Sequence, residues 1–316
     1  MARVSSRISP RTRGYLAIVT AAAFFGAWPT LSKLVLAAIH SPIVLAFLVQ
    51  LIPAVFLLPT LRRVRIPRAQ VMPILFTGLA GSVLAPLIYF VGLQRTTATN
   101  SVLLSNSEAL FTVLLAYAFL GERAAPREYV ALVGIAAGAF VVTTELRFGD
   151  VRFLEFLIGN VLLVIAAICW ATSNTVSSHL LRRMQILPLL AFQFLIGAVS
   201  YAPIVALSGD PIDVPWGIVP LLLFLALSAV VMFSLLFFYA LQTIGAMRAG
   251  AILPTSALWG VPLAVFLLPN ESLSAVQILG GALMVGSLVA FYLFHRPATA
   301  EGETLKPSAS DGPDSP

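Results

Sequence analysis

The sequence predicts an all-α membrane protein, with ten transmembrane helices arranged as two inverted five-helix repeats around a central cavity. Three observations predict this fold class. Long apolar runs follow one another along a chain of 316 residues that is 59% hydrophobic and only 10% charged, more apolar surface than a soluble domain of this size buries. Arginines gather in alternate loops. The two halves of the chain repeat the same short motifs.

The apolar runs place the helices and the segments between them. In the first half we expect spans at 15–39, 41–60, 71–93, 98–120 and 129–144. In the second half we expect them at 156–178, 187–207, 216–241, 249–269 and 274–295. The domains follow: a cytoplasmic tail 1–14, a first repeat 15–145, an outer connecting loop 146–155, a second repeat 156–295 and a tail 296–316, whose proline, serine and acidic residues predict disorder.

The basic residues orient these spans in the bilayer. With both termini inside, fifteen lysines and arginines fall in inner segments and three in outer ones, and Lys33 lies within the first span. Inner loops of membrane proteins carry such an excess. We therefore expect a multi-pass protein of a bacterial-type inner cell membrane with both termini in the cytoplasm.

Short motifs at corresponding positions of the two halves indicate an internal repeat. Leu93-Gln94 closes the third span and Leu241-Gln242 closes the eighth, 148 residues later. The turn Gly121-Glu122-Arg123 has its counterpart 149 residues later in Asn270-Glu271-Ser272. Because five spans is an odd number, the second half enters the membrane from the opposite side, which is the inverted-repeat arrangement of secondary transporters.

Glu108 is the most informative residue of the chain. By helical rise it lies roughly 13 Å from the Thr99 end of its predicted span and about 18 Å from the Leu120 end, inside a hydrocarbon core that is ~30 Å thick. An acid at that depth is costly and by default faces a bundle interior or a wet cavity. The alternative is a capped acid that only hydrogen-bonds a neighbouring helix.

Other polar and aromatic side chains in the spans predict a substrate-binding cavity. Besides Glu108, the candidates are Trp28, Lys33, Tyr89, Ser105, Trp170, Asn174, Tyr239, Ser256 and Trp259. Each of them alone is also explained as helix–helix packing. Lys33 has two interpretations, because its stem could reach the outer surface or its ammonium could face the cavity. Together they describe an aromatic-lined, mostly neutral pocket that suits an amphipathic organic solute.

Several chemistries have no motif in this chain. There is no phosphate-binding GxxxxGK[ST] loop, no HExxH, no GxSxG and no Cys/His cluster with metal-ligand spacing. We therefore expect no enzyme activity, no cofactor and no metal. The net charge of +6 follows from membrane topology, so no nucleic-acid partner is expected. The single cysteine, Cys169, is interpreted as a packing residue.

Three motifs of the first half stand out: Phe25-Gly26 followed by Lys33, Pro42 at the start of the second span, and the run from Asn106 to Thr112 that leads into Gly121-Glu122-Arg123. With these motifs and its two repeats, the sequence resembles the EamA family of the drug/metabolite transporter superfamily. The resemblance covers about residues 15–295. The chain departs from the family pattern at Ala109, where proline is usual, and at Gln50, where many members carry arginine. The resemblance implies ten helices around a central cavity and export or exchange of metabolites such as amino acids.

The expected function is secondary active transport of a small organic metabolite by alternating access, as an exporter or exchanger. Glu108 would then be the proton-linked group or the group that binds a substrate amine. Two alternatives stay open: a nucleotide-sugar or phosphate-ester carrier, which needs paired lysines or arginines, and a non-transporting membrane scaffold or lipid-handling protein. The expected partners are the small-molecule substrate and the bilayer; coupling to protons and a homodimer are left open.

Overall fold

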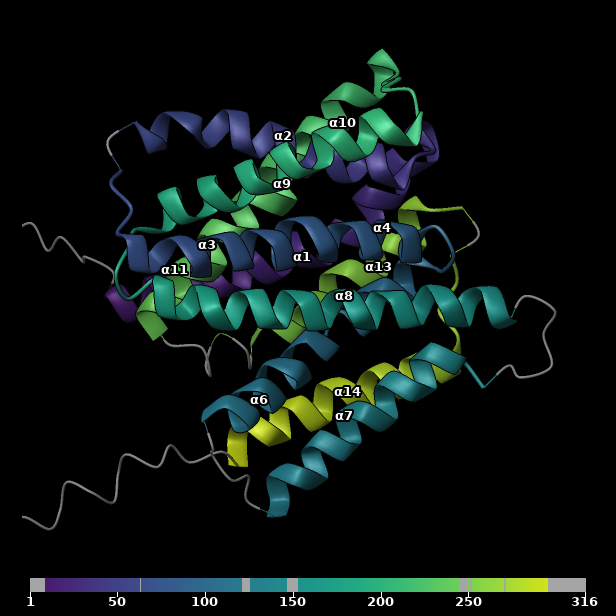
Figure 1. Ribbon diagram of the computed structural model, residues 1–316. Coiled ribbons are helices and arrows are strands. Elements are labelled where there is room, and N and C mark those ends of the chain that lie inside the picture. Colours follow the sequence, from purple (N-terminus) through teal and green to yellow (C-terminus); the bar gives the residue numbers. More distant parts are fainter. Residues whose placement is uncertain are drawn as a thin grey trace, which may run out of the picture.

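The computed structural model describes residues 9–62, 64–120, 126–146, 153–244, 249, 252–269 and 271–294, and throughout these ranges the regular elements are helical (Figure 1). Six helices are long and apolar enough to cross a membrane: Pro10–Ile39, Pro42–Leu61, Arg68–Leu93, Leu154–Leu180, Ile186–Ser208 and Trp216–Ile244. Shorter apolar helices cover Tyr129–Val142, Leu253–Leu267 and Ala275–Phe291. The predicted all-α membrane class is thereby confirmed for the described part of the chain.

The bounds of the elements follow the predicted spans to within a few residues. The first half contains α1 (Pro10–Ile39), α2 (Pro42–Leu57), η1 (Leu58–Leu61), α3 (Arg68–Gly78), η2 (Leu79–Leu84), α4 (Ala85–Leu93), α5 (Ala98–Leu104), α6 (Ser107–Leu120) and α7 (Pro126–Thr144). The second half contains α8 (Phe153–Leu180), α9 (Ile186–Ser208), η3 (Trp216–Ile218), α10 (Val219–Phe224), η4 (Leu225–Met232), α11 (Phe233–Ile244), η5 (Leu253–Thr255), α13 (Ser256–Leu267) and α14 (Ala275–Phe294).

Some predicted segments lie outside the described residues. These are Gly121-Glu122-Arg123, most of the connecting loop 146–155, the tail 296–316 and the first eight residues of the tail 1–14. Where the first tail is described, α1 begins at Pro10, five residues before the predicted span.

Hydroxyl side chains start several of these helices. The Ser41 hydroxyl accepts the backbone N–H of Val44 at 3.2 Å, with Pro42 at the first helical position of α2. Thr97 does the same for α5 by accepting the N–H of Asn100 at 3.0 Å. His40, with φ at 63°, ends α1 in the left-handed conformation and lets the chain turn directly into α2.

The predicted span 98–120 is broken into α5 and α6 at Ser105 and Asn106. Their side chains satisfy the backbone of the preceding turn: the Ser105 hydroxyl donates to the Ser101 carbonyl at 2.7 Å, and the Asn106 amide donates to the Leu103 carbonyl at 3.1 Å. Serine and asparagine compete with the helical ladder in this way. As a result Glu108 lies in the first turn of α6 instead of in the middle of one long helix.

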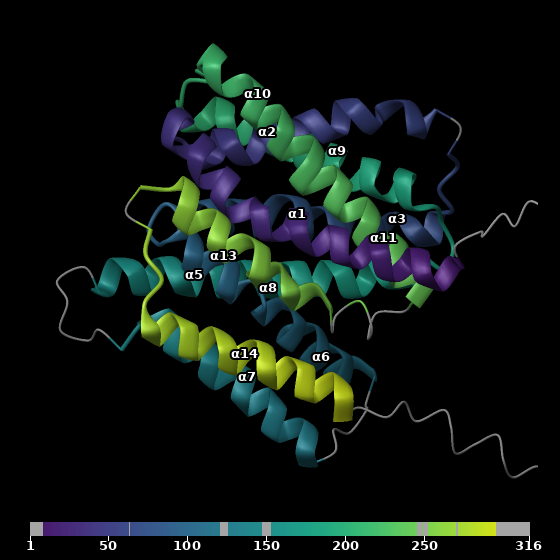
Figure 2. The same ribbon diagram turned by 180° about the vertical axis from the view of Figure 1, so that it is seen from behind.

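Two helices lie at the centre of the packing. Helix α1 contacts α11 and α13, and α8 contacts α4 and α6. Helix α2 packs on α9. The pair α7 and α14 run side by side along one side of the molecule, as Figures 1 and 2 show from opposite directions.

Glycine permits the close approach of α7 and α14. A Cβ atom added at Gly138 would lie 2.7 Å from the Gly280 carbonyl oxygen and 2.8 Å from the Met284 nitrogen, closer than real Cβ contacts. Small residues at such positions let membrane helices pack backbone to backbone. Gly286, also on α14, has open space around its added Cβ.

This contact gives a stability prediction. Gly138→Ala forces α7 and α14 apart and should lower the unfolding free energy by ~1–3 kcal/mol, the usual effect of overpacking. Gly286→Ala is the matched control and should be neutral or slightly stabilising, because alanine favours a helix by about 1 kcal/mol over glycine. Thermal unfolding of the two purified variants in detergent measures both; equal melting temperatures would contradict the packing argument.

Candidate functional site

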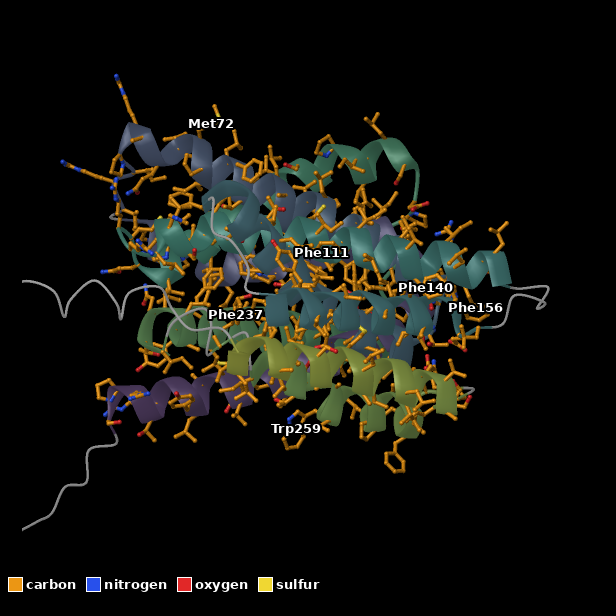
Figure 3. The ribbon with its side chains drawn as sticks, turned by 90° about the horizontal axis from the view of Figure 1, so that it is seen from below. Met72, Phe111, Phe140, Phe156, Phe237 and Trp259 are labelled. Carbon is orange, nitrogen blue, oxygen red and sulfur yellow. The ribbon has the colours of Figure 1, made fainter. Side chains whose placement is uncertain are left out.

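A cavity of about 110 Å³ lies between helices of both halves of the chain. Its lining comes from α1, α2, η2, α4, α6, α8, α9, η4 and α11. The aromatic residues of the lining are Phe25, Trp28, Trp170, Phe194, Phe233, Phe237 and Phe238. The polar residues are Gln50, Ser82, Glu108, Ser173, Asn174, Gln193 and Ser234. Figure 3 shows Phe237 among the side chains between the helices.

The helix next to the cavity is widened into a π-helical segment, η2. The Ala85 N–H donates to the carbonyl of Ala80, five residues back. The next residue, Pro86, has no N–H, so the Gly81 carbonyl loses its donor within the helix. The indole Nε1 of Trp170 donates to that carbonyl instead, at 3.0 Å.

Side chains of α8 and α9 satisfy two further carbonyls of this span. The Ser173 hydroxyl donates to the Thr77 carbonyl at 3.0 Å, and the Tyr201 hydroxyl donates to the Val83 carbonyl at 2.5 Å. A second π-helical segment, η4, contributes Ala229 and Val230 to the lining. Single turns of π-helix are often found at functional sites.

Glu108 and Asn174 form the polar contact of the cavity. The Asn174 amide nitrogen donates to Glu108 Oε1 at 2.7 Å, which links α6 to α8. The Glu108 side chain comes from the first turn of α6, where the helix dipole favours a negative charge. Glu108 is 8% exposed. Two buried polar atoms of the described lining residues have no partner, the acceptor Gln50 Oε1 and the donor Trp28 Nε1.

Aromatic rings surround this contact. Phe25 stacks on Phe233 with ring centroids 4.8 Å apart, and Phe233 stacks on Phe237 at 5.6 Å. Trp28 and Trp170 form a second group around Tyr89, whose ring centroid lies 5.7 Å and 5.3 Å from theirs. The aromatic rings that line the cavity therefore come from α1, α8, α9 and α11.

A separate polar cluster surrounds the N-terminus of α5, away from the cavity. Glu271 accepts the backbone N–H groups of Ala98 at 2.6 Å and Thr99 at 3.2 Å, together with the Thr99 hydroxyl at 2.8 Å. It thereby caps the N-terminus of α5 from the second half of the chain. Lys33 forms an ion pair with Glu271 at 3.4 Å and donates to the Thr96 carbonyl.

Amide side chains extend this cluster. The Asn100 amide donates to Glu145 at 2.8 Å, and the Gln277 amide donates to Asn100 at 2.7 Å and to Glu145 at 3.1 Å. The Thr96 hydroxyl donates to Asn160 at 2.5 Å. Asn100 and Asn160 are fully buried. We refer to this set, with Lys33, Thr99 and Glu271, as the end cluster; it joins α1, α5, α7, α8 and α14.

The structure separates the ten predicted site residues into groups. Trp28, Glu108, Trp170 and Asn174 line the cavity. Tyr89 lies directly behind Trp28 and Trp170, and its hydroxyl accepts from Ser101 at 2.9 Å. Lys33, for which two orientations were left open, belongs to the end cluster, where it pairs with Glu271.

The remaining four predicted residues do not line the cavity. Ser105 lies at the turn between α5 and α6, and Tyr239 is half-buried on α11. Ser256 is buried on α13, and its backbone lies against Gly26 of α1. Trp259 is 53% exposed and lies at the edge of the molecule (Figure 3), because the next residue, Gly260, occupies the side of α13 that meets α1.

Some lining residues were not among the predicted ones. Gln50 and Gln193 are the amide side chains of two otherwise apolar helices, which was the signal available for them. Gln193 donates to the Ser177 hydroxyl at 2.9 Å. Phe233 and Phe237 recur four residues apart, but an aromatic pair at that spacing is equally typical of a lipid-facing stripe.

The described residues contain no group of three or more His, Cys, Asp or Glu side chains that could hold a metal ion. The free cysteine, Cys169, is half-buried on α8. Within the described ranges, the polar chemistry of the spans is thus concentrated in the cavity and the end cluster.

The described helices enclose a cavity between the two halves of an all-helical membrane protein, an arrangement that membrane transporters use. The chain belongs to the EamA-like transporter family, whose model matches it twice, over residues 12–144 and 157–293. This confirms the resemblance drawn from the sequence.

Proteins similar to this chain carry transporter names. One named "Uncharacterized transporter" from Methanothermobacter thermautotrophicus is 29% identical over 299 residues, covering 89% of this chain and 87% of that protein. Another of the same name from Archaeoglobus fulgidus is 24% identical over 215 residues, covering 67% and 72%. One solved crystal structure, 20% identical, matches 94% of this chain and 100% of its own with a TM-score of 0.64, which supports the fold.

The Trp170 contact gives a second prediction. Trp170→Phe leaves the Gly81 carbonyl without its donor and should lower the unfolding free energy by ~1–3 kcal/mol, the penalty of an unpaired buried polar group. Trp259→Phe makes the same substitution at an exposed site and should change it by less than about 0.5 kcal/mol. Thermal unfolding in detergent compares the two. A loss at Trp259 as large as that at Trp170 would rule out the hydrogen bond as the cause.

Proposed function

We propose that this protein is a secondary active transporter that exports or exchanges a small organic metabolite by alternating access. The observation that carries the proposal is the Glu108–Asn174 contact, a buried carboxyl group in a cavity between both halves of the chain. A transporter of this kind binds its substrate near the bilayer midplane, between repeats. The cavity takes its lining from the middle of α1 and α8, as such a site requires.

We propose ten membrane crossings in two inverted repeats, 15–145 and 156–295. Three features support this. The family model matches each half separately. Helices at equivalent places in the two halves make equivalent contacts, since α1 packs on α11 and α13 while α8 packs on α4 and α6. Each half also carries one π-helical segment, η2 or η4, within its third span.

We place the end cluster on the outer side of the membrane and both termini in the cytoplasm. The positive-inside rule puts the loop ends with Arg62, Arg182 and Arg183 in the cytoplasm. On α8, Asn160 of the end cluster precedes Trp170 of the cavity by ten residues, about 15 Å along the helix. The end cluster therefore lies between the cavity and the outer surface.

The end cluster would then act as the outer gate of the transport cycle. Its ion pair and amide contacts join α1 and α5 of the first half to α14 of the second. For the cavity to open outward these contacts must break together. The described structure corresponds to the state in which they are formed.

Two other functions would require different properties of the cavity. A carrier of phosphate esters needs basic residues around its ligand, and the described lining contains no lysine or arginine. A scaffold or lipid-handling protein would have an interior that stays inaccessible from both sides of the membrane.

Proton coupling at Glu108 gives a third prediction. In proteoliposomes, wild-type uptake should depend on pH, while Glu108→Gln, which cannot exchange a proton, should show uptake that is independent of pH and at least tenfold slower. The substrate for the assay is the compound that most raises the melting temperature in a screen of amino acids, amines, purines and vitamins. Asp213→Asn, in the exposed loop 209–215, is the control and should behave as wild type. An unchanged pH profile in Glu108→Gln would exclude this role.

The outer gate gives a fourth prediction. In a Cys169→Ala background, Ser234→Cys places a thiol in the cavity lining. A membrane-impermeant maleimide added from outside should label it slowly, and Glu271→Gln should speed that labelling about tenfold, because losing ~1.4 kcal/mol of contacts shifts an equilibrium tenfold. Lys33→Met should act in the same direction and Asp213→Asn should not. A thiol unreactive from both sides in every background would instead indicate a scaffold.

A further inference from the structure

The described lining of the cavity contains an acidic side chain and no basic one. Among the described lining residues Glu108 is the one with an ionisable side chain, and none of these residues is a lysine, arginine or histidine. Lys33, which could have supplied a positive charge, is held by Glu271 and the Thr96 carbonyl in the end cluster. Gln50 is neutral as well.

The partners of Glu108 offset only part of a negative charge. Asn174 contributes one neutral hydrogen bond, to Oε1. The N-terminus of α6 contributes a partial positive charge of about half a unit. An ionised carboxylate in this site therefore leaves a net negative potential, and its full compensation requires a bound proton or a bound cation.

The rest of the lining also suits a cation. Besides the Glu108 carboxylate, the lining contains Gln50 Oε1, a buried acceptor without a partner on a residue that is 4% exposed. An ammonium group has three donors and no acceptor, so it can donate to oxygens of this kind. The lining also contains the indole rings of Trp28 and Trp170, and aromatic rings of this kind attract organic cations when water is excluded.

The volume limits the size of the ligand. The cavity of about 110 Å³ is somewhat smaller than the dry cavities of ~150 Å³ that hold benzene. The volume therefore favours a compact ligand.

We infer that the cavity binds a compact organic amine that carries no carboxylate, with its ammonium group against Glu108 and its apolar body between the aromatic rings. This inference rests on the proposed transport function and specifies its substrate class. A ligand carboxylate would meet the same negative potential as Glu108 and find no basic residue among the described lining residues. The site should therefore discriminate between an amine and the amino acid from which it differs only by a carboxylate.

The test uses four small molecules that share one apolar skeleton. Isoamylamine carries the ammonium alone, leucine adds a carboxylate, 4-methylpentanoate carries the carboxylate alone, and isoamyl alcohol is neutral. Binding of each to the purified full chain is measured by isothermal titration calorimetry in lipid nanodiscs at pH 7. Isoamylamine should bind at least tenfold more tightly than the other three.

Variants and pH check the role of the carboxylate. Glu108→Gln should weaken isoamylamine binding at least tenfold, whereas Asp213→Asn, at an exposed loop position, should leave it unchanged. Wild-type affinity should also fall as the pH is lowered, because protonation removes the charge of Glu108; this second measurement needs no variant to fold.

The results distinguish the substrate class from transport itself. Leucine or 4-methylpentanoate binding as tightly as isoamylamine would overturn the inference, and so would an affinity unaffected by Glu108→Gln. Neither outcome decides whether the protein is a transporter. That proposal is tested separately by the labelling of Ser234→Cys, which reports access to the cavity whatever ligand it holds.

Discussion

The structure depends on the requirement that backbone carbonyls inside hydrocarbon find donors within the protein. Where a span is regular, its own ladder meets this requirement. Where Pro86 removes an N–H from the third span, Trp170 supplies the missing donor, and the hydroxyls of Ser173 and Tyr201 bond neighbouring carbonyls of the same span. Irregular backbone is tolerated in a membrane protein where it is covered by protein or lines a cavity, and η2 meets both conditions.

The same requirement explains why polar chemistry and broken helices coincide. The break at Ser105 and Asn106 places Glu108 at a helix N-terminus, the one position in a span where backbone dipoles favour an acid. Glu271 uses the free N–H groups at the other end of the same broken span. A continuous helix from 98 to 120 would still offer its first N–H groups to Glu271, but it would leave Glu108 far from any helix N-terminus, so the acid of the cavity depends on this discontinuity.

Much of the fold could be predicted from the sequence because hydropathy reports directly on burial in lipid. The all-helical class, the family and the cavity positions of Glu108, Asn174, Trp28 and Trp170 follow from polar or aromatic residues that stand out in apolar spans. What could not be predicted is the direction a side chain faces. In the sequence Trp259 and Trp170 are both tryptophans in apolar spans with polar neighbours. In the structure Gly260 lies on the side of α13 that meets α1, and Trp259 is exposed.

Long-range partners were also beyond sequence reasoning. Lys33 and Glu271 are 238 residues apart, and nothing in the local pattern of either residue indicates the other. The π-helical segments were not predicted either, because hydrophobic periodicity does not distinguish a π turn from an α turn. Pro86 indicates in the sequence that a backbone N–H donor is missing, but only the fold shows that Trp170 of α8 provides one.

Helices of one half pack on helices of the other, and these contacts bear on which helices can move together. Helix α8 belongs to the second half of the chain, yet it packs on α4 and α6 of the first and is tied to η2 through Trp170; α1 is joined in the same way to α11 and α13. A rigid body held together by these contacts would therefore combine helices of both halves. Severing the chain between its halves would leave each fragment without the helices that complete its own body, so neither fragment is a self-sufficient unit.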